Sequence, residues 1–182
     1  MAANRVQPQG FWEHPQPLPG YVPAWHVVGP FADPNGKLLD AELPPDTEID
    51  PAALYPVQFG QATWRVRQST AGTLGLSQLY GAISGIAYAF CDVESDTEQT
   101  VQMRLCTDDD AWVRLNGEEV YRFDGTRGLD FDKDIVPVTL PKGTSRMLVK
   151  SNNRGGMWAI FMRFTDAAGK PLEGLRFSPA GS

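Results

Sequence analysis

The stretch TDDDAWVRLNGEEVY, residues 107–121, decides the fold of this chain. Three consecutive carboxylates, Asp108 to Asp110, stand directly before a short run in which apolar and polar residues alternate. The pair Asn116-Gly117 then predicts a type I′ hairpin turn, because that turn needs φ > 0 at both central positions. A second strand, from Glu119 to Phe123, returns from the turn. We therefore expect a β-hairpin whose aspartates lie in a loop at a strand end, where they either face water or hold a positive group.

Composition fits one acidic globular domain. The chain has 182 residues, 42% of them hydrophobic, and a formal net charge of −6. A nucleic-acid partner is not expected, because phosphate binding needs a basic stripe and the sequence has none. No apolar run approaches the roughly 18 residues that span a bilayer, so no membrane partner is expected. The N-terminus lacks an apolar segment of the signal-peptide kind.

The sequence divides into an arm and a single domain. Residues 1–22 are rich in Pro and Gln and predict an extended arm, for which Phe11, Trp12 and Tyr21 are candidate anchors. Residues 23–178 contain short apolar stretches separated by turns and no helical period sustained over three turns. This pattern predicts an all-β fold, a single antiparallel β-sandwich.

The patterning also predicts which faces are buried. Val101, Met103 and Leu105 alternate with polar residues, and Trp158, Ile160, Met162 and Phe164 share one face of a later strand. Trp25 and Trp64 also lie in strands, so we expect them, with Trp158, in the core. The long irregular segment from residue 32 to 61 is expected to pack on the surface or to help form a site. Cys91 and Cys106 fit either a disulfide or two free, half-buried thiols.

From about residue 24 to 175 the order of motifs resembles the galactose-binding-like jelly rolls attached to secreted bacterial carbohydrate-active enzymes. The matching motifs are WHVVGPF at 25–31, IAYA at 86–89, TDD at 107–109, VRLNGEEV at 113–120, VTLPKG at 138–143, MLVK at 147–150 and WAIFMR at 158–163. The central motifs are also similar to the sugar-binding sandwich domains of β-galactosidase-type glycosidases and to the protective-antigen-type lectin domain. The resemblance implies a jelly roll and an extracellular or periplasmic location.

In the lectin domain, an Asp-Asp pair before such a strand can hold calcium next to a bound sugar. The resemblance makes Asp108 and Asp109 that pair, and Asp130 and Asp132 are candidate further ligands, since Ca²⁺ takes 6 to 8 oxygen ligands. Asp110 stands where these families usually have glycine. The alternative is a solvated acidic strand end that discourages edge pairing.

A sugar site needs an exposed ring with planar polar groups around it. Val113 is expected to point inward, so the ring of Trp112 is expected on the outer face or among the loops. The candidate platform comprises Trp112, Tyr121, Arg114, Arg122, Asn152, Asn153 and Arg154. The alternative is that Trp112 packs under the arm or a neighbouring loop.

Catalysis is not expected. The chain contains two histidines, His14 and His26, and neither is placed to serve a Ser-His-Asp arrangement. The leading hypothesis is a non-catalytic carbohydrate-binding or accessory module of an extracytoplasmic polysaccharide-processing system, with a poly- or oligosaccharide ligand and a catalytic domain or subunit as partner. The alternatives are a protein-interaction sandwich with no sugar site and a small glycan hydrolase that uses a pair of carboxylates.

Overall fold

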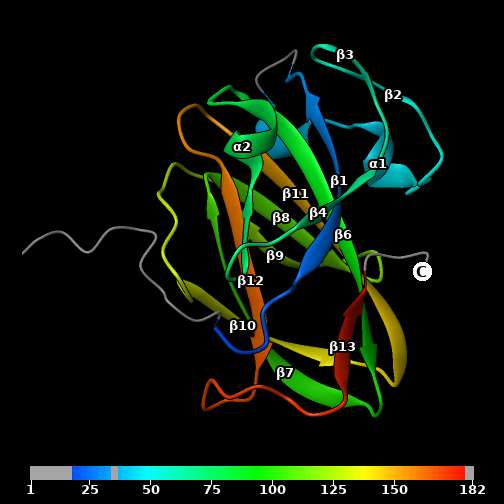
Figure 1. Cartoon of the computed structure of the whole chain (residues 1–182), viewed down its shortest axis with the longest axis vertical. Helices are drawn as coiled ribbons and strands as arrows, with labels where there is room; N and C mark the ends of the chain where they lie inside the picture. Colours follow the sequence, from blue (N-terminus) through cyan, green and yellow to red (C-terminus); the bar gives the residue numbers. More distant parts are fainter. Residues whose placement is uncertain (1–17, 34–36, 179–182) are drawn as a thin grey trace, which may run out of the picture.

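The computed structural model describes residues 18–33 and 37–178, and two antiparallel β-sheets packed face to face dominate it (Figure 1). The larger sheet has the order β4-β1-β6-β11-β8-β9, and β13 pairs with β6 beside β1. Its strands are β1 (Ala24–Phe31), β4 (Arg65–Gln68), β6 (Gly85–Ser95), β8 (Asp110–Leu115), β9 (Glu118–Phe123), β11 (Gly143–Asn153) and β13 (Leu175–Ser178). The predicted β-sandwich is confirmed.

The smaller sheet has the order β10-β7-β12-β5. Its strands are β5 (Thr73–Gly75), β7 (Gln99–Asp108), β10 (Asp134–Leu140) and β12 (Ala159–Thr165). A separate hairpin pairs β2 (Tyr55–Val57) with β3 (Gly60–Ala62). The helical elements are η1 (Leu38–Asp40), α1 (Pro44–Thr47) and α2 (Leu76–Tyr80). Within the described residues, no helix has the length and apolar character that crossing a membrane requires.

The main core lies between the two sheets and follows from the alternation of each strand. Val101, Met103 and Leu105 of β7 all belong to it, as predicted. Trp158, Ile160, Met162 and Phe164 also belong to it and are at most 1% exposed. These residues share one face of the smaller sheet, because β12 pairs with β7 and places Met162 opposite Leu105 and Phe164 opposite Met103.

A second core covers the outer face of the larger sheet. Ile86, Tyr88 and Phe90 of β6 point away from the main core and pack against Tyr55 and Trp64. We call residues 37–64 the covering segment, since they carry η1, α1, β2 and β3 across this face. Strand β6 is therefore apolar on both faces, which explains its near-continuous hydrophobic run. Of the two alternatives for the long irregular segment, its residues 37–61 show packing on the surface, across the outer face of the larger sheet.

Two smaller predictions were also resolved. Asn116 and Gly117 have φ values of 53° and 87°, as the hairpin turn between β8 and β9 requires. Cys91 and Cys106 are both free and belong to different clusters, so the alternative of two free thiols holds, but both are fully buried rather than half-buried.

Only the end of the predicted arm lies within the described residues. Val22 is fully buried in the main core, and its backbone N–H donates to the carbonyl of Met162 at 3.1 Å. Tyr21 forms a bridge with Arg163. Phe11 and Trp12 lie outside the described residues, so the division at residue 22 stays a prediction.

Candidate functional site

The aspartate stretch lies where β7 passes into β8. Asp108 ends β7, Asp110 begins β8, and Asp109 joins them through a cis Asp108-Asp109 peptide bond. Asp109 and Asp110 are 2% and 0% exposed. The stretch is thus a buried strand junction and not the solvated loop that was one of the two expectations. Buried carboxylates need cations or N–H donors, because desolvation penalises an unpaired charge.

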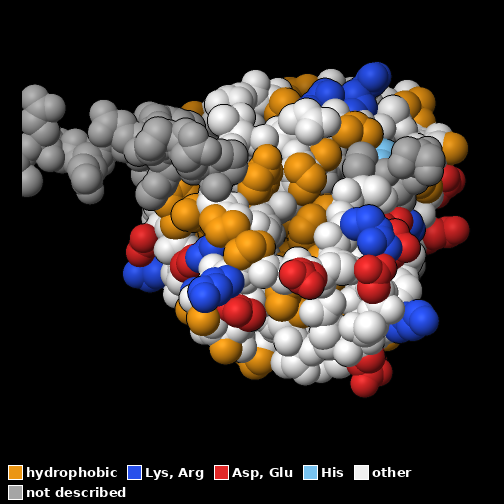
Figure 2. All heavy atoms as spheres, turned by 60° about the horizontal axis from the view of Figure 1, so that its bottom comes forward, with side chains coloured by type: hydrophobic (Ala, Val, Ile, Leu, Met, Phe, Trp, Pro, Cys, Tyr) orange, Lys and Arg blue, Asp and Glu red, His pale blue; other side chains and the backbone are white. Residues whose placement is uncertain are grey.

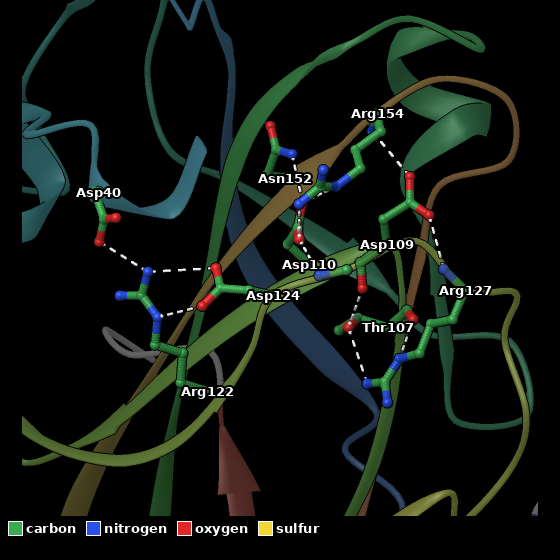
Figure 3. Close-up of polar contacts among 10 residues, drawn as sticks. Asp40, Thr107, Asp109, Asp110, Arg122, Asp124, Arg127, Asn152 and Arg154 are labelled. Carbon is green, nitrogen blue, oxygen red and sulfur yellow. Dashed lines mark hydrogen bonds and ion pairs between the residues drawn. The ribbon is translucent and has the colours of Figure 1, made fainter. Parts of the chain in front are cut away.

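Asp110 receives four hydrogen bonds from three residues (Figure 3). Arg154 makes a two-pronged contact, with Nε 2.9 Å from Oδ2 and Nη2 2.8 Å from Oδ1. Asn152 Nδ2 donates to Oδ2 at 2.7 Å, and the backbone N–H of Gly125 donates to Oδ1 at 2.5 Å. This pairing joins the end of β11 to the start of β8.

Asp109 holds two loops through their backbones. Its Oδ1 accepts the N–H of Arg127 at 3.1 Å, and its Oδ2 accepts the N–H of Arg154 at 2.9 Å. The side chain of Arg127 extends the connection, because Nη1 lies 2.6 Å from Asp134 Oδ2 and Nε donates to the carbonyl of Thr107 at 3.0 Å. The loop after β9 is therefore fixed to the strand junction by charge.

The structure does not bring the predicted calcium ligands together. Asp130 pairs with Lys133 at 3.3 Å, and Asp132 pairs with Arg104 at 3.3 Å and with Arg163. The described part of the chain contains no group of three or more His, Cys, Asp or Glu side chains that could hold a metal ion. Calcium binding at these residues stays a prediction from the sequence.

Asp108 differs from its two neighbours because it is partly exposed. Burial, followed by the charge of Asp109, raises the pKa of its carboxyl group to about 6. The carboxyl group of Asp108 therefore changes its protonation state closer to neutral pH than an ordinary aspartate does.

The outer face of β8 and β9 carries the next group of predicted site residues. Trp112 is opposite Arg122 in the strand register, and Arg122 pairs with Asp124 at 2.8 Å and with Asp40 at 2.7 Å. The guanidinium of Arg114 lies 3.6 Å from the centroid of the Trp112 ring. Trp112 lies on the outer face, as predicted, but Arg114 covers one side of its ring.

Tyr121 corrects the predicted platform. It is opposite Val113 in the register, and directly opposed residues of a sheet share a face. Tyr121 therefore points away from the Trp112 side and packs against the main core. Its hydroxyl donates to Asp134 Oδ2 at 2.6 Å and accepts from Arg127 at 3.1 Å.

Charges of both signs also lie close together on the face that is reached from the bottom of Figure 1. Figure 2 shows one face of the molecule, on which Asp and Glu side chains lie beside Lys and Arg side chains, around a central group of hydrophobic side chains.

Three predicted site residues, Asn152, Asn153 and Arg154, line an open groove of about 410 Å³, with Ala32, Asp33, Gln58, Ser84 and Gly85. We call it the β11-end groove. It lies where β1 and β11 end and β6 begins, and the β2–β3 turn contributes Gln58 to its wall. A hollow of about 360 Å³ elsewhere is lined by one predicted site residue, Arg114. Another, of about 480 Å³, is lined by none of them. The groove therefore gathers more of the predicted site than either.

The amide of Asn153 is the most informative group of the groove. The residue is 1% exposed, and its Nδ2 donates to the carbonyl of Ile83 at 2.7 Å, which fixes the orientation of the amide. Its Oδ1 is buried and has no hydrogen-bond partner within the described residues. Buried polar atoms almost always have a partner, so this acceptor fits a hydroxyl or N–H supplied from outside the chain.

Sequence reasoning missed Gln58, Phe59, Asp33 and Ser84. Gln58 and Phe59 form the turn between β2 and β3, and Phe59 is 71% exposed. A large apolar residue at a turn tip is unusual, and the dipeptide Phe59-Gly60 was the signal that could have indicated it. The site now combines hydrogen-bonding groups in a groove with an exposed ring on the turn that forms part of its wall.

Comparison with known proteins gives likenesses of fold. No protein-family model matches the chain, and neither does any curated protein. The PA14 domain of the MpAFP antifreeze protein is 16% identical, with a TM-score of 0.43 over 54% of this chain and 54% of that one. The chain thus spans about half the length of that structure.

Two further solved structures are similar. The PA14 sugar-binding domain from an RTX adhesin is 16% identical, with a TM-score of 0.43 over 87% of this chain and 72% of that one. A family 35 carbohydrate binding module from an environmental isolate is 14% identical, with a TM-score of 0.37 over 55% of this chain and 74% of that one. Each of the three likenesses is partial, and the assignment of the β-sandwich rests on the strand order of the two sheets.

Proposed function

We propose that this chain is a non-catalytic carbohydrate-binding module and that its ligand lies in the β11-end groove. The observation that carries the proposal is the buried, unpartnered Oδ1 of Asn153 in a groove of about 410 Å³. A volume of this order suits a small ligand, since binding clefts typically measure about 300 to 1,000 Å³. A sugar hydroxyl is the kind of donor that such an acceptor needs.

The other groups of the groove support the same ligand class. Asp33 and Gln58 add a carboxylate and an amide to the lining, which are groups of the kind that hydrogen-bond to vicinal hydroxyl groups. Asp33 Oδ1 also accepts the backbone N–H of Lys37 at 2.9 Å. Phe59 offers a ring that is 71% exposed on the adjoining turn. Stacking on one ring face with polar contacts at the edge is the usual division of roles in a small-molecule site.

A non-catalytic role is supported by the small number of carboxyl groups that line the groove. Glycoside hydrolysis uses two carboxyl groups on either side of the scissile bond. Among the described residues that line the groove, Asp33 is the single acidic one. Asp110, behind Asn152 and Arg154, is engaged in an ion pair with Arg154 at 2.8 Å.

The proposal extends to the setting of the module. A groove open to solvent admits an internal segment of a poly- or oligosaccharide, as an accessory module of a polysaccharide-processing system requires. We place that system outside the cytoplasm and give the module a catalytic domain or subunit as its partner. Affinity is expected to be modest, because a shallow site buries little surface and must offset the ordering of the sugar.

The test is affinity electrophoresis against plant, algal and bacterial polysaccharides, followed by calorimetry with oligosaccharides of the retained polymer. A sugar ring that covers one face of Phe59 removes on the order of 60 Å² from water, which at about 25 cal/mol/Å² contributes ~1.5 kcal/mol, or about tenfold in affinity. Phe59→Ala should weaken binding by that factor. Ile135→Ala is the matched control, since Ile135 is a large apolar residue, 48% exposed, on β10 of the other sheet.

The outcomes separate the candidate functions. No retardation by any polysaccharide would contradict the proposal and favour the protein-interaction alternative. Binding that is lost in Trp112→Ala but kept in Phe59→Ala would move the site to the outer face of β8. Turnover of a model glycoside that disappears in Asp33→Asn would favour the hydrolase.

A further inference from the structure

Strand β4 forms one edge of the larger sheet. It pairs with β1 on one side, and within the described residues no strand pairs with its other side. We call that other side the β4 edge. Residues of an antiparallel strand direct their N–H and C=O groups alternately to the two sides, so part of the backbone of β4 is directed away from β1. Such an edge is a template for a further strand.

The side chains of Arg65 and Arg67 lie along the β4 edge. Arg67 is opposite Trp25 and Arg65 is opposite Val27, and both partners belong to the main core. Because directly opposed residues share a face, both arginines lie on the face of the sheet that carries the main core. Arg65 is exposed and Arg67 is half-buried, so both guanidinium groups are on the rim of the core rather than in it.

Neither arginine has a carboxylate partner among residues 18–33 and 37–178. Nη1 of Arg67 donates to the carbonyl of Val66 at 3.1 Å. The other arginines of the described chain each pair with a carboxylate, except Arg114, which covers the ring of Trp112. The β4 edge thus carries two uncompensated positive charges, two residues apart, in a chain whose formal net charge is −6.

A small cavity opens beside Arg67, where β4 and β5 separate. Thr70 and Thr73 exchange backbone hydrogen bonds of 2.8 and 2.9 Å across a tight turn, and the two strands belong to different sheets. The cavity has a volume of about 80 Å³, and Arg67, Leu79 and Met157 are among its lining residues. Leu79 and Met157 are 36% and 50% exposed, so an apolar side chain from outside the chain would remove apolar surface from water there.

We propose that the β4 edge is a docking site for a partner protein, which adds an acidic strand to the larger sheet. An antiparallel strand would place carboxylates at alternate positions, opposite Arg67 and Arg65. The residue between them would lie opposite Val66, which is 43% exposed, and is expected to be apolar. An apolar side chain two residues before the first carboxylate reaches the cavity. From its N-terminus, the partner strand therefore reads apolar, any residue, acidic, apolar, acidic.

Charge decides against the other occupants of this edge. A basic strand would bring like charges together, and a neutral strand would leave both arginines without partners. A second copy of this chain, paired through the same edge, would set arginines against arginines. Charged side chains on a sheet edge generally prevent pairing with other strands, and here they restrict the partner to an acidic one. The inference does not depend on whether the β11-end groove binds sugar.

The probe for this site is a synthetic peptide, Thr-Leu-Thr-Glu-Val-Glu-Val, blocked at both ends and carrying a fluorophore. Fluorescence anisotropy measures its binding to the full chain, and hydrogen–deuterium exchange shows which amides it protects. We expect weak, saturable binding, because a strand of this length buries less surface than a standard interface. Exchange should slow at residues 65–68, since an added strand accepts hydrogen bonds from their outward N–H groups. Added salt should weaken binding, because it screens exposed charges.

Charge reversal tests the arginines directly. Arg65→Glu combined with Arg67→Glu should weaken binding of the peptide by at least about tenfold, since it replaces two attractive cross-strand pairs with repulsive ones. A peptide with Lys in place of both Glu residues should bind this double variant better than it binds the native chain. The matched control is Lys142→Glu combined with Lys170→Glu, which makes the same change in net charge at exposed positions outside the strands. It should leave binding within about twofold, because distant exposed charges are screened.

The proposal is overturned by any of four results. The first is a native chain that binds the peptide with a dissociation constant above about 1 mM. The second is equal weakening in the two double variants, which would show a general effect of net charge. The third is protection of amides away from β4. The fourth is self-association of the free chain that Arg65→Glu with Arg67→Glu abolishes in sedimentation, which would make a second copy the occupant. If the double variant does not fold, binding of the Lys peptide by the native chain as tightly as the Glu peptide overturns it.

Discussion

Among the substitutions discussed here, replacement of Lys150 is expected to lower the free energy of unfolding most. The side chain of this residue is 1% exposed, and its Nζ lies 2.8 Å from Asp46 Oδ2 and 2.5 Å from the carbonyl of Ala41. Both partners belong to the covering segment, so one lysine of β11 anchors that segment to the larger sheet. Burial lowers the pKa of Lys150, while the hydrogen bond and charge of Asp46 oppose this.

The cost of replacing Lys150 follows from the partner that is left behind. Lys150→Met keeps the length and apolar stem but leaves Asp46, whose side chain is 14% exposed, without its cation. Breaking a buried pair by removing one partner typically lowers the free energy of unfolding by about 3 to 5 kcal/mol. Because Asp46 is partly exposed, we expect a loss at the lower end of this range, about 3 kcal/mol. For a domain of this size that is a fall in melting temperature of about 6 to 12 °C.

A double-mutant cycle separates the ion pair from general packing. Asp46→Asn removes the charge and keeps an amide oxygen for the N–H of Leu43, which Asp46 Oδ2 accepts at 3.0 Å. In urea unfolding followed by fluorescence and circular dichroism, the double variant should be more stable than the sum of the single losses by about 1 to 3 kcal/mol. A coupling energy near zero, or a loss below about 0.5 kcal/mol in Lys150→Met, would refute the anchoring role.

Three further predictions concern single groups. The folded-state pKa of Asp108, about 6, lies above the ordinary aspartate value, so the stability that its protonation contributes is lost as the pH rises from about 4 through 6. Asp108→Asn does not titrate, so in urea titrations its stability relative to that of the native chain should be higher at pH 7.5 than at pH 4.5. The same stability difference at both pH values would contradict this. Burial raises the pKa of both cysteine thiols, so Ellman's reagent should react with neither in the native chain and with both, Cys91 and Cys106, in guanidinium, whereas native reactivity would contradict their burial. Gly117→Ala should lower stability by about 1 kcal/mol in the same urea assay, because φ is 87° there, and no loss would mean that the turn relaxes.

Much of the fold could be predicted because periodicity reports which face of a strand is buried. The alternation in β7 and β12 named Met103 and Phe164 as inward residues, and both belong to the main core. The Asn116-Gly117 turn was predictable because its backbone conformation restricts the residue types. These features depend on neighbours in the sequence, so the sequence suffices to predict them.

The site was harder to predict because its contacts join distant parts of the chain. Asp110 and Arg154 are 44 residues apart, and nothing near either residue indicates that they pair. The acidic run therefore suggested a metal, whereas its cation comes from the end of another strand. Tyr121 was misplaced for a related reason, because the register with Val113 decides its face and a local pattern does not fix that register.

The two walls of the β11-end groove are held in place by two neighbouring cross-strand pairs of β11 and β8. Lys150 is opposite Trp112 and Asn152 is opposite Asp110 in the pairing of β11 with β8, two residues apart along each strand. Lys150 holds the covering segment, which carries Gln58, and Asp110 holds the end of β11. Lys150→Met should therefore weaken sugar binding without any contact to the ligand, and by less than Phe59→Ala does, since it disorders one wall and removes no ligand contact. Unchanged affinity in Lys150→Met, alongside the expected loss of stability, would show that the groove keeps its shape independently of that anchor.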